Sequence, residues 1–292
     1  MVFLHLKRGN ESQFLFETSV TMPISKLNKE IVLMYNGRLK ISRICSEMEG
    51  LKDHGPMFPP EIIGLTEEQV RELKLVDQYA EKVVPSDGWV YNRDPVGRRN
   101  GRQPNVKMQE LLLKSINDAK EMVSKKMIDD NKSLTLKHVQ NAIDILKGAV
   151  TIVYPMGLPP HDPIYMEFNN TEDLSGTQAA LDVIEPSKMQ LWFAGRQMLD
   201  EKLLSDYLGK NEKCKVIVKI VKHGEGAPGR EPVFNEEVRK QIMLQQYRRQ
   251  EELKRLEEDH DDSYLNSKWA DNSNLKQQLH GIQNINFRFG SK

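Results

Sequence analysis

Side chains suited to acid-base, nucleophilic or metal chemistry are scattered along this sequence. Its seven histidines form no H-E-x-x-H pair, and the chain contains no G-x-S-x-G nucleophile elbow and no P-loop. Cys45 and Cys214 lie far apart, without a C-x-x-C pair or a Cys/His cluster. This spacing argues against a disulfide scaffold and a zinc module, and it favours a reducing intracellular location. We therefore expect no catalytic, metal-binding or cofactor-binding residue, and an interaction protein in place of an enzyme.

One local cluster of basic residues occurs in the loop 93–107. Against the single acid Asp94, it contains Arg93, Arg98, Arg99, Arg102 and Lys107. One interpretation is a contact for phosphates or an acidic protein tail, with Arg98, Arg99 and Arg102 as binding residues. The other is a solvated connector whose arginines bond the carbonyls at helix ends. Because the whole chain balances 42 basic against 42 acidic residues, any attraction to a charged partner must be local.

Length and composition narrow the class of protein. The chain has 292 residues, of which 38% are hydrophobic and 29% charged, and its mean hydropathy is -0.59. The longest apolar run, residues 149–154, is far shorter than the roughly 20 residues of a membrane-spanning helix. The N-terminus lacks the apolar core of a signal peptide. We expect a soluble protein of the cytosol or nucleus with about two domains, without membrane insertion and without a nucleic-acid partner.

The N-terminal half predicts a hairpin followed by helices. In residues 1–54, strands at 2–7 and 13–20 form a β-hairpin, and helical patterns cover 24–37 and 39–48. Asn36-Gly37 is expected to end the first helix. In residues 55–148, a proline-rich connector at 55–64 precedes a helix that Thr66 and Gln69 start as a capping box and that Pro85 ends. Apolar stripes then predict helices at 105–129 and 133–147, an antiparallel hairpin closed by Gly148.

Residues 149–222 predict the order strand, loop, strand, helix, strand. The strands AVTIVYP and PIYMEFN begin at Ala149 and Pro163, a helix capped by Thr171 follows, and further strands are MQLWFAG and the alternating Val216, Val218 and Ile220. Within residues 149–221, the run LWFAGRQ, then Asp200, LSDY at 204–207 and the last strand resemble ubiquitin in residue type, order and spacing. The resemblance implies a ubiquitin-like β-grasp domain.

Two departures limit what the resemblance implies. The last strand continues into further chain and not into a free diglycine tail, and Arg196 stands where ubiquitin has its principal acceptor lysine. A conjugated modifier is therefore not expected. Trp192 falls at the position of the isoleucine in ubiquitin's hydrophobic patch. Trp192 and Ile217 are thus candidates to anchor a partner protein. The alternative is that they cover a surface of their own chain, such as one of its helices.

Residues 223–292 read as a Gly-rich linker, a charged helix at 231–259 and a polar tail from 260. The helix has a thin apolar stripe, which favours a docked or solvated helix over a coiled coil. The tail is expected to fold on binding or to strap the domain. The fold class that follows is α+β, with an N-terminal hairpin and helix unit, a central helical hairpin, the β-grasp domain and a polar C-terminal helix.

Three segments are also similar to the cilia- and flagella-associated protein 298 family, the kurly family. They read MVFLHLKRGNESQFLFETSVTMPISKLNKEI, WVYNRDPVGRRNGRQPN and LWFAGRQMLDEKLLSDYLGKNEKCKVIVKI. The resemblance implies a non-enzymatic adaptor or assembly factor for ciliary motility, acting on axonemal outer dynein arms and in planar cell polarity. It implies partners among dynein assembly factors or arm components, and a location in the cytoplasm, at the basal body and on the cytoskeleton. The alternative is a microtubule or acidic-tail binder that uses the loop 93–107.

Overall fold

A computed structural model of the chain describes residues 1–230 and 236–258. Residues 1–230 form one compact unit, and residues 231–292 belong to a second. The predicted boundaries at residues 54, 148 and 222 all lie inside the first unit. Among the described residues, no helix combines the length and the apolar character needed to cross a bilayer. The predicted polar tail, from residue 260, lies outside the described residues.

The predicted N-terminal hairpin is confirmed. Strands β1 (Val2–Arg8) and β2 (Glu11–Thr18) pair antiparallel, and Gly9 adopts a positive φ of 60° in the turn. Only glycine enters this region without a steric penalty, which explains its place there. Val2, Leu4 and Leu6 alternate with half-buried residues and are fully buried, so one face of the hairpin enters the core.

The main sheet joins the two ends of the first unit. Its five strands have the order β2-β1-β7-β5-β6, with β5 (Met189–Phe193), β6 (Arg196–Gln197) and β7 (Lys215–Lys222). Strand β7 lies between β5, its antiparallel neighbour, and β1, with which it pairs in parallel. The short helix α8 (Ser205–Leu208) connects β6 to β7. The predicted mixed α+β class is confirmed.

Placing a complete β-grasp within residues 149–222 was wrong. The predicted strand at 149–155 is mainly the end of helix α5 (Leu136–Val153), and the one at 163–169 is helix α6 (Pro163–Asn169). Ala149, Val150 and Val153 are buried at helical spacing. In the sequence they belong to a short continuous apolar run, and such a run fits a buried helix as well as a buried strand. The missing half of the sheet is the N-terminal hairpin, more than 170 residues away in sequence.

Helix α1 (Ile24–His54) is 31 residues long and packs on the sheet with Ile24, Leu27 and Ile31 in the common core. The predicted stop at Asn36-Gly37 was wrong. The side chain of Asn36 donates to the carbonyl of Ile184 at 2.7 Å and accepts from its N–H at 3.1 Å. A Cβ at Gly37 would lie 2.6 Å from Val139 Cγ1 of α5. This Gly permits close helix contact and does not end a helix.

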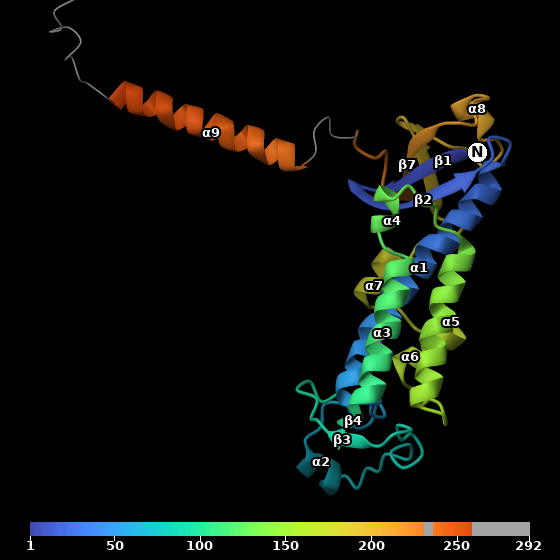
Figure 1. Ribbon diagram of the computed structural model, residues 1–292, viewed down its shortest axis with the longest axis vertical. Helices are drawn as coiled ribbons and strands as arrows, with labels where there is room; N and C mark the ends of the chain where they lie inside the picture. The colour runs from blue at the N-terminus through green and yellow to red at the C-terminus, as the bar shows by residue number, and fades with distance from the viewer. Residues whose placement is uncertain (231–235, 259–292) are drawn as a thin grey trace, which may run out of the picture. The chain divides into compact units, whose positions relative to one another are not determined.

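Helices α3 (Val106–Met122) and α5 pack on each other and on α1 as the predicted antiparallel hairpin (Figure 1). The link contains α4 (Lys126–Asp129), so the predicted helix 105–129 is interrupted. Helix α5 runs through Gly148, where we expected it to end. The predicted helix beginning at Thr171 is only α7 (Gln178–Asp182), preceded by Thr177. Its shortness reflects a segment without a continuous apolar stripe.

Residues 55–104 form a lobe at the end of α1 that is remote from the sheet (Figure 1). The lobe contains α2 (Glu67–Glu72) and a two-stranded sheet of β3 (Trp89–Tyr91) and β4 (Arg102–Pro104). The predicted capping box of Thr66 and Gln69 is confirmed, but the helix ends well before Pro85. We call residues 55–104 the distal lobe. In the second unit, α9 (Glu236–Glu258) confirms a helix within the predicted span 231–259.

Candidate functional site

The outer face of the main sheet carries the two apolar residues that the sequence singled out. Trp192 of β5 lies opposite Lys219 of β7, and Ile217 of β7 lies opposite His5 of β1. Trp192 and Ile217 are therefore diagonal neighbours on one face, within reach of a common partner. Ile217 is 40% exposed, whereas the inward-facing Val218 is fully buried. The predicted pairing of these two positions on the outward face agrees with this geometry.

Trp192 is partly covered by its own chain. The residue is half-buried, and its indole Nε1 is buried without a hydrogen-bond acceptor among the described residues. The neighbouring Lys219 is only 7% exposed, and its Nζ donates to the carbonyl of Gly229 at 2.7 Å. The segment after β7 thus folds back over this side of the sheet. Of the two residues, Ile217 is the one that remains exposed to solvent.

The same segment has the spacing G-x-G-x-x-G from Gly224 to Gly229, that of a dinucleotide-binding loop. Such a loop connects a strand directly to a helix whose N-terminus receives the phosphates. Here residues 224–230, which follow the strand β7, form no helix, and the Gly229 carbonyl accepts from Lys219. The segment folds back over the sheet, so the glycine spacing alone does not indicate a nucleotide-binding site.

Arg99, one of the three predicted binding arginines, is held inside the protein. Its guanidinium donates from Nη1 to the carbonyl of Gly55 at 2.9 Å, and from Nη2 to the carbonyl of Glu47 at 3.0 Å and its Oε2 at 2.6 Å. The side chain is 5% exposed. Carbonyls at the end of a helix lack intrahelical partners, and Arg99 supplies a donor to one of them, the carbonyl of Gly55, the residue that caps α1. For Arg99, the second interpretation, a bond to helix-end carbonyls, is confirmed.

The other two predicted arginines lie in different surroundings. Arg98 is about half exposed, with Nη2 3.6 Å from Oε1 of Glu47. Arg102 donates to the carbonyl of Ala80, and its guanidinium lies 5.1 Å from the centre of the Trp89 ring. The structure therefore brings Arg98 and Arg99 together on Glu47, while Arg102 secures the strand pair β3-β4. The three do not form one open basic surface.

Asp162 is the buried partner beneath Arg99. It is fully buried, accepts from the N–H groups of Met57 at 3.1 Å and Ile164 at 2.9 Å, and lies 3.9 Å from Arg99 Nη1. Burial raises the pKa of Asp162 above its ordinary value, and the Arg99 charge opposes this shift. The hydroxyl of Tyr154 is also buried, without a hydrogen-bond partner among the described residues. These groups fix α6 and the start of the distal lobe to the end of α1.

Asp94 organises the basic loop. Its carboxylate accepts from the N–H groups of Val96 at 3.0 Å, Arg98 at 2.8 Å and Arg99 at 3.0 Å. Burial acts to raise the pKa of Asp94, but the three backbone hydrogen bonds outweigh it and hold the pKa below its ordinary value. The only acid of the loop is thus used to shape it, and it holds Arg99 in position for its contacts with α1.

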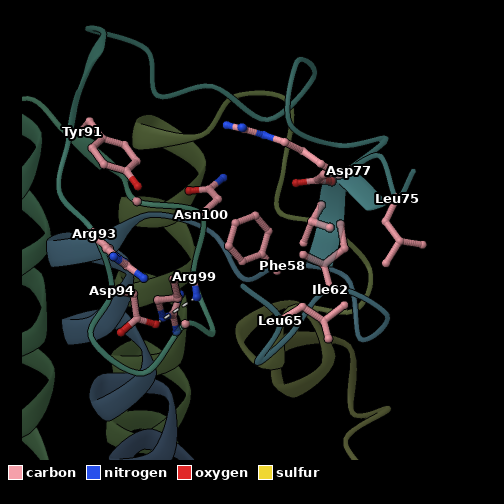
Figure 2. A pocket seen from close by; sticks show the side chains of 14 residues that line it. Phe58, Ile62, Leu65, Leu75, Asp77, Tyr91, Arg93, Asp94, Arg99 and Asn100 are labelled. Carbon is pink, nitrogen blue, oxygen red and sulfur yellow. Dashed lines mark hydrogen bonds between the residues drawn. The ribbon is translucent and has the colours of Figure 1, made fainter. Parts of the chain in front are cut away.

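The distal lobe also contains a pocket of about 300 Å³. Figure 2 shows the apolar Phe58, Ile62 and Leu65 on one side and Tyr91 and Asn100 on the other. Sequence reasoning did not identify this site, because its walls come from a proline-rich connector, α2 and a short strand. The signal present in the sequence was the triplet Trp-Val-Tyr at 89–91, three large apolar residues in an otherwise polar loop.

Comparison with known proteins gives matches over nearly the full chain. A family model described as "Cilia- and flagella-associated protein 298" matches residues 189–285. A protein of that name from Drosophila melanogaster is 57% identical over 289 residues, and one from Homo sapiens is 54% identical over 288. Cilia- and flagella-associated protein 298-A of Xenopus laevis is 55% identical over 288 residues. In all three, the alignment covers 99% of this chain and 99% of the relative.

No solved structure matches the chain. Membership of the ubiquitin-like β-grasp fold family therefore stays a prediction. The structure does contain a sheet that packs on helix α1. Since the matches span both ends of the chain, they include the two parts of the main sheet and the distal lobe between them.

Proposed function

The chain belongs to the cilia- and flagella-associated protein 298 family, and we propose that it is a non-enzymatic adaptor or assembly factor for ciliary motility. In this proposal it acts in the assembly or placement of axonemal outer dynein arms and in planar cell polarity. Its place of action is the cytoplasm and the base of the cilium. The observation that carries the proposal is the identity above 50% with relatives named for cilia and flagella over their whole length.

The arrangement of side chains supports a protein-binding role and not a catalytic one. The strongly buried acids of the first unit are occupied by structural partners: Asp162 by backbone N–H groups and Glu167 by Arg43, whose Nε lies 2.5 Å from Oε1. The seven histidines are spread over the chain. In contrast, the outer face of the sheet presents Ile217 beside a half-covered Trp192. We take this face to be the contact for dynein arm components or their assembly factors.

Proximity labelling in ciliated cells tests this proposal. The full chain, fused to a labelling enzyme, is expected to label axonemal dynein chains or their assembly factors. Ile217→Asp should reduce that labelling because it places a charge in the apolar contact. Ile152→Asp is the matched control, since Ile152 is an exposed isoleucine on α5, away from the sheet face. If the wild-type chain labels no dynein component or assembly factor, the proposal fails.

The alternative, binding of microtubules or acidic tails through the loop 93–107, has less support from the geometry. Arg99 would have to leave Glu47 and Gly55 to meet a partner, and Arg102 would have to leave Ala80. Of these three arginines, only Arg98 could meet a partner without losing a side-chain hydrogen bond, because its contact with Glu47 is a half-exposed ion pair. Salt-sensitive co-sedimentation with microtubules that Arg98→Ala abolishes would favour this alternative, since exposed charge attraction is screened within about 8 Å at physiological salt.

A further inference from the structure

The distal lobe exposes several large apolar side chains. All three residues of β3 are exposed, with Val90 and Tyr91 each more than 60% accessible. The same lobe exposes Leu73, Val76 and Val96. Isolated exposed apolar residues are common on proteins, but a group on one small lobe indicates a surface that binds something.

Strand β3 has a free edge. The N–H of Asn92 donates to the carbonyl of Gly101 at 2.8 Å, one step beyond the β3-β4 register. Hydrogen-bonded and non-bonded pairs alternate along an antiparallel ladder, so Val90 is the β3 residue that bonds β4. The backbone N–H and C=O of Trp89 and Tyr91 therefore point away from β4. Among the described residues, no third strand pairs with them.

The pocket adjoins this edge, since Tyr91 belongs to both (Figure 2). Its volume of about 300 Å³ is at the lower end of the range typical of ligand sites, roughly 300–1,000 Å³. Phe58, Ile62 and Leu65 give it an apolar wall. A space of this size and character suits one or two large apolar side chains better than a cofactor.

The free charge at the pocket is positive. Both acids in its lining accept backbone N–H groups: Asp94 from the basic loop, and Asp77 from Tyr79 at 2.9 Å. Arg99 is engaged with α1. Arg93 lines the pocket, is exposed, and has no hydrogen bond or ion pair to another residue in the part of the chain that the structure describes. Its guanidinium can therefore receive a carboxylate.

We propose that the distal lobe binds an extended peptide segment of a partner protein, which adds as a strand to the free edge of β3. In the bound state, a large apolar side chain of the peptide fills the pocket, and an aspartate or glutamate two or more residues away pairs with Arg93. Strand addition supplies affinity through backbone hydrogen bonds, and the pocket and Arg93 supply specificity. A bilayer offers no partners for the backbone groups of Trp89 and Tyr91, so the edge favours a peptide over a membrane.

This surface is separate from the sheet face of the proposed function, and it stands whether or not the partner belongs to a cilium. A phage library of random linear peptides, selected on the full-length chain, provides the test. Selected peptides are expected to share a large apolar residue and an acidic residue. Labelled synthetic copies are then titrated by fluorescence anisotropy.

Arg93→Glu should weaken the affinity about tenfold or more, the loss expected for a charge-assisted hydrogen bond. Arg196→Glu is the matched control, an exposed arginine in β6 that should leave the affinity unchanged. Methylating single amide nitrogens of the peptide should abolish binding at alternate positions, because only alternate N–H groups of an added strand face β3. Circular dichroism checks that the variants remain folded.

Three outcomes would overturn the proposal. In the first, the selected peptides bind the wild type and Arg93→Glu equally well, or the library enriches no sequence on the wild type relative to that variant. Another is binding that tolerates methylation at every amide. The third is self-association, seen by sedimentation and lost in Val90→Lys, which would make the occupant of the edge a second copy of the chain.

Discussion

The sheet end and the distal lobe of the first unit are stabilised by different interactions. The sheet end buries fully apolar side chains, such as Leu4, Leu191 and Val218, on α1. The distal lobe is attached by buried polar groups, with Arg99 and Asp162 at the centre. Apolar contacts tolerate small rearrangements at a modest cost in stability. A buried charge that loses its partner destabilises the fold strongly. The two ends should therefore respond differently to mutation and to pH.

The largest effect should come from Arg99→Ala. Removing this guanidinium leaves the carbonyl of Gly55 without its donor and the buried Asp162 without the positive charge that lies 3.9 Å from it. Breaking a buried pair in this way costs about 3–5 kcal/mol. We expect a loss of this size in the free energy of unfolding measured with urea, with amide exchange increasing first in the distal lobe.

Arg98→Ala is the control for Arg99→Ala, since its side chain is about half exposed in the same loop. Its effect should stay below about 1 kcal/mol, as for other surface ion pairs. Equal losses in both variants would contradict the assignment of Arg99 as the residue that fixes the lobe to α1.

Gly37→Ala should have the next largest effect, and it acts on the apolar part of the unit. The added Cβ would meet Val139 Cγ1 at 2.6 Å, so α1 and α5 must separate locally. We expect a destabilisation of about 1–3 kcal/mol, typical of overpacking. Gly37→Ala combined with Val139→Ala should recover part of the loss that the first change causes, which thermal unfolding would reveal.

Gly148→Ala is the matched control within α5. A Cβ at Gly148 has open space around it, and the residue lies inside a helix. Since glycine is about 1 kcal/mol less favourable than alanine in a helix, this variant should be more stable than the wild type. A destabilised Gly148→Ala would show that the packing around α5 differs from that described.

Asp94 should make the distal lobe sensitive to acid. Because its folded pKa lies below the ordinary value of 3.8, its hydrogen bonds contribute stability at neutral pH that is lost as the pH falls below about 5 towards the folded pKa. Asp94→Asn should be less stable than wild type at pH 7, and the difference should shrink in acid. Urea unfolding from pH 7 to pH 3 measures this.

Asp162→Asn should change the pH dependence in the opposite direction. The pKa of Asp162 is raised by burial, so the folded state holds its proton more tightly than the unfolded chain. Its contribution to stability is present below the ordinary pKa and is lost as the pH rises through the raised value. If both variants shift the profile in the same direction, the two carboxyl groups do not have the environments described.

The smallest effect should come from Trp192→Phe on the sheet. Phenylalanine keeps most of the apolar ring and removes a buried N–H that has no acceptor among the described residues. Removing such a donor offsets the loss of ring area, so we expect the stability to change by less than about 1 kcal/mol. A larger loss in thermal unfolding would indicate that Nε1 has a partner in the folded chain.

The elements whose signals are local could be predicted from the sequence. The hairpin at residues 2–18, the capping box at Thr66, the apolar stripe of α3 and the alternation in β7 all appear where periodicity placed them. Each depends on spacing within one turn or one strand, so neighbouring residues suffice to predict it.

Which distant segments meet became known from the three-dimensional fold. It paired β7 with β1, made a helix of the apolar run 149–153, and showed that Gly37 is a site of helix contact and that Arg99 is buried. A short apolar run can form either a strand or a helix. An arginine in a loop can either face solvent or bond a backbone carbonyl. These choices depend on the partner that the rest of the chain brings near, and that partner lies tens to hundreds of residues away in the sequence.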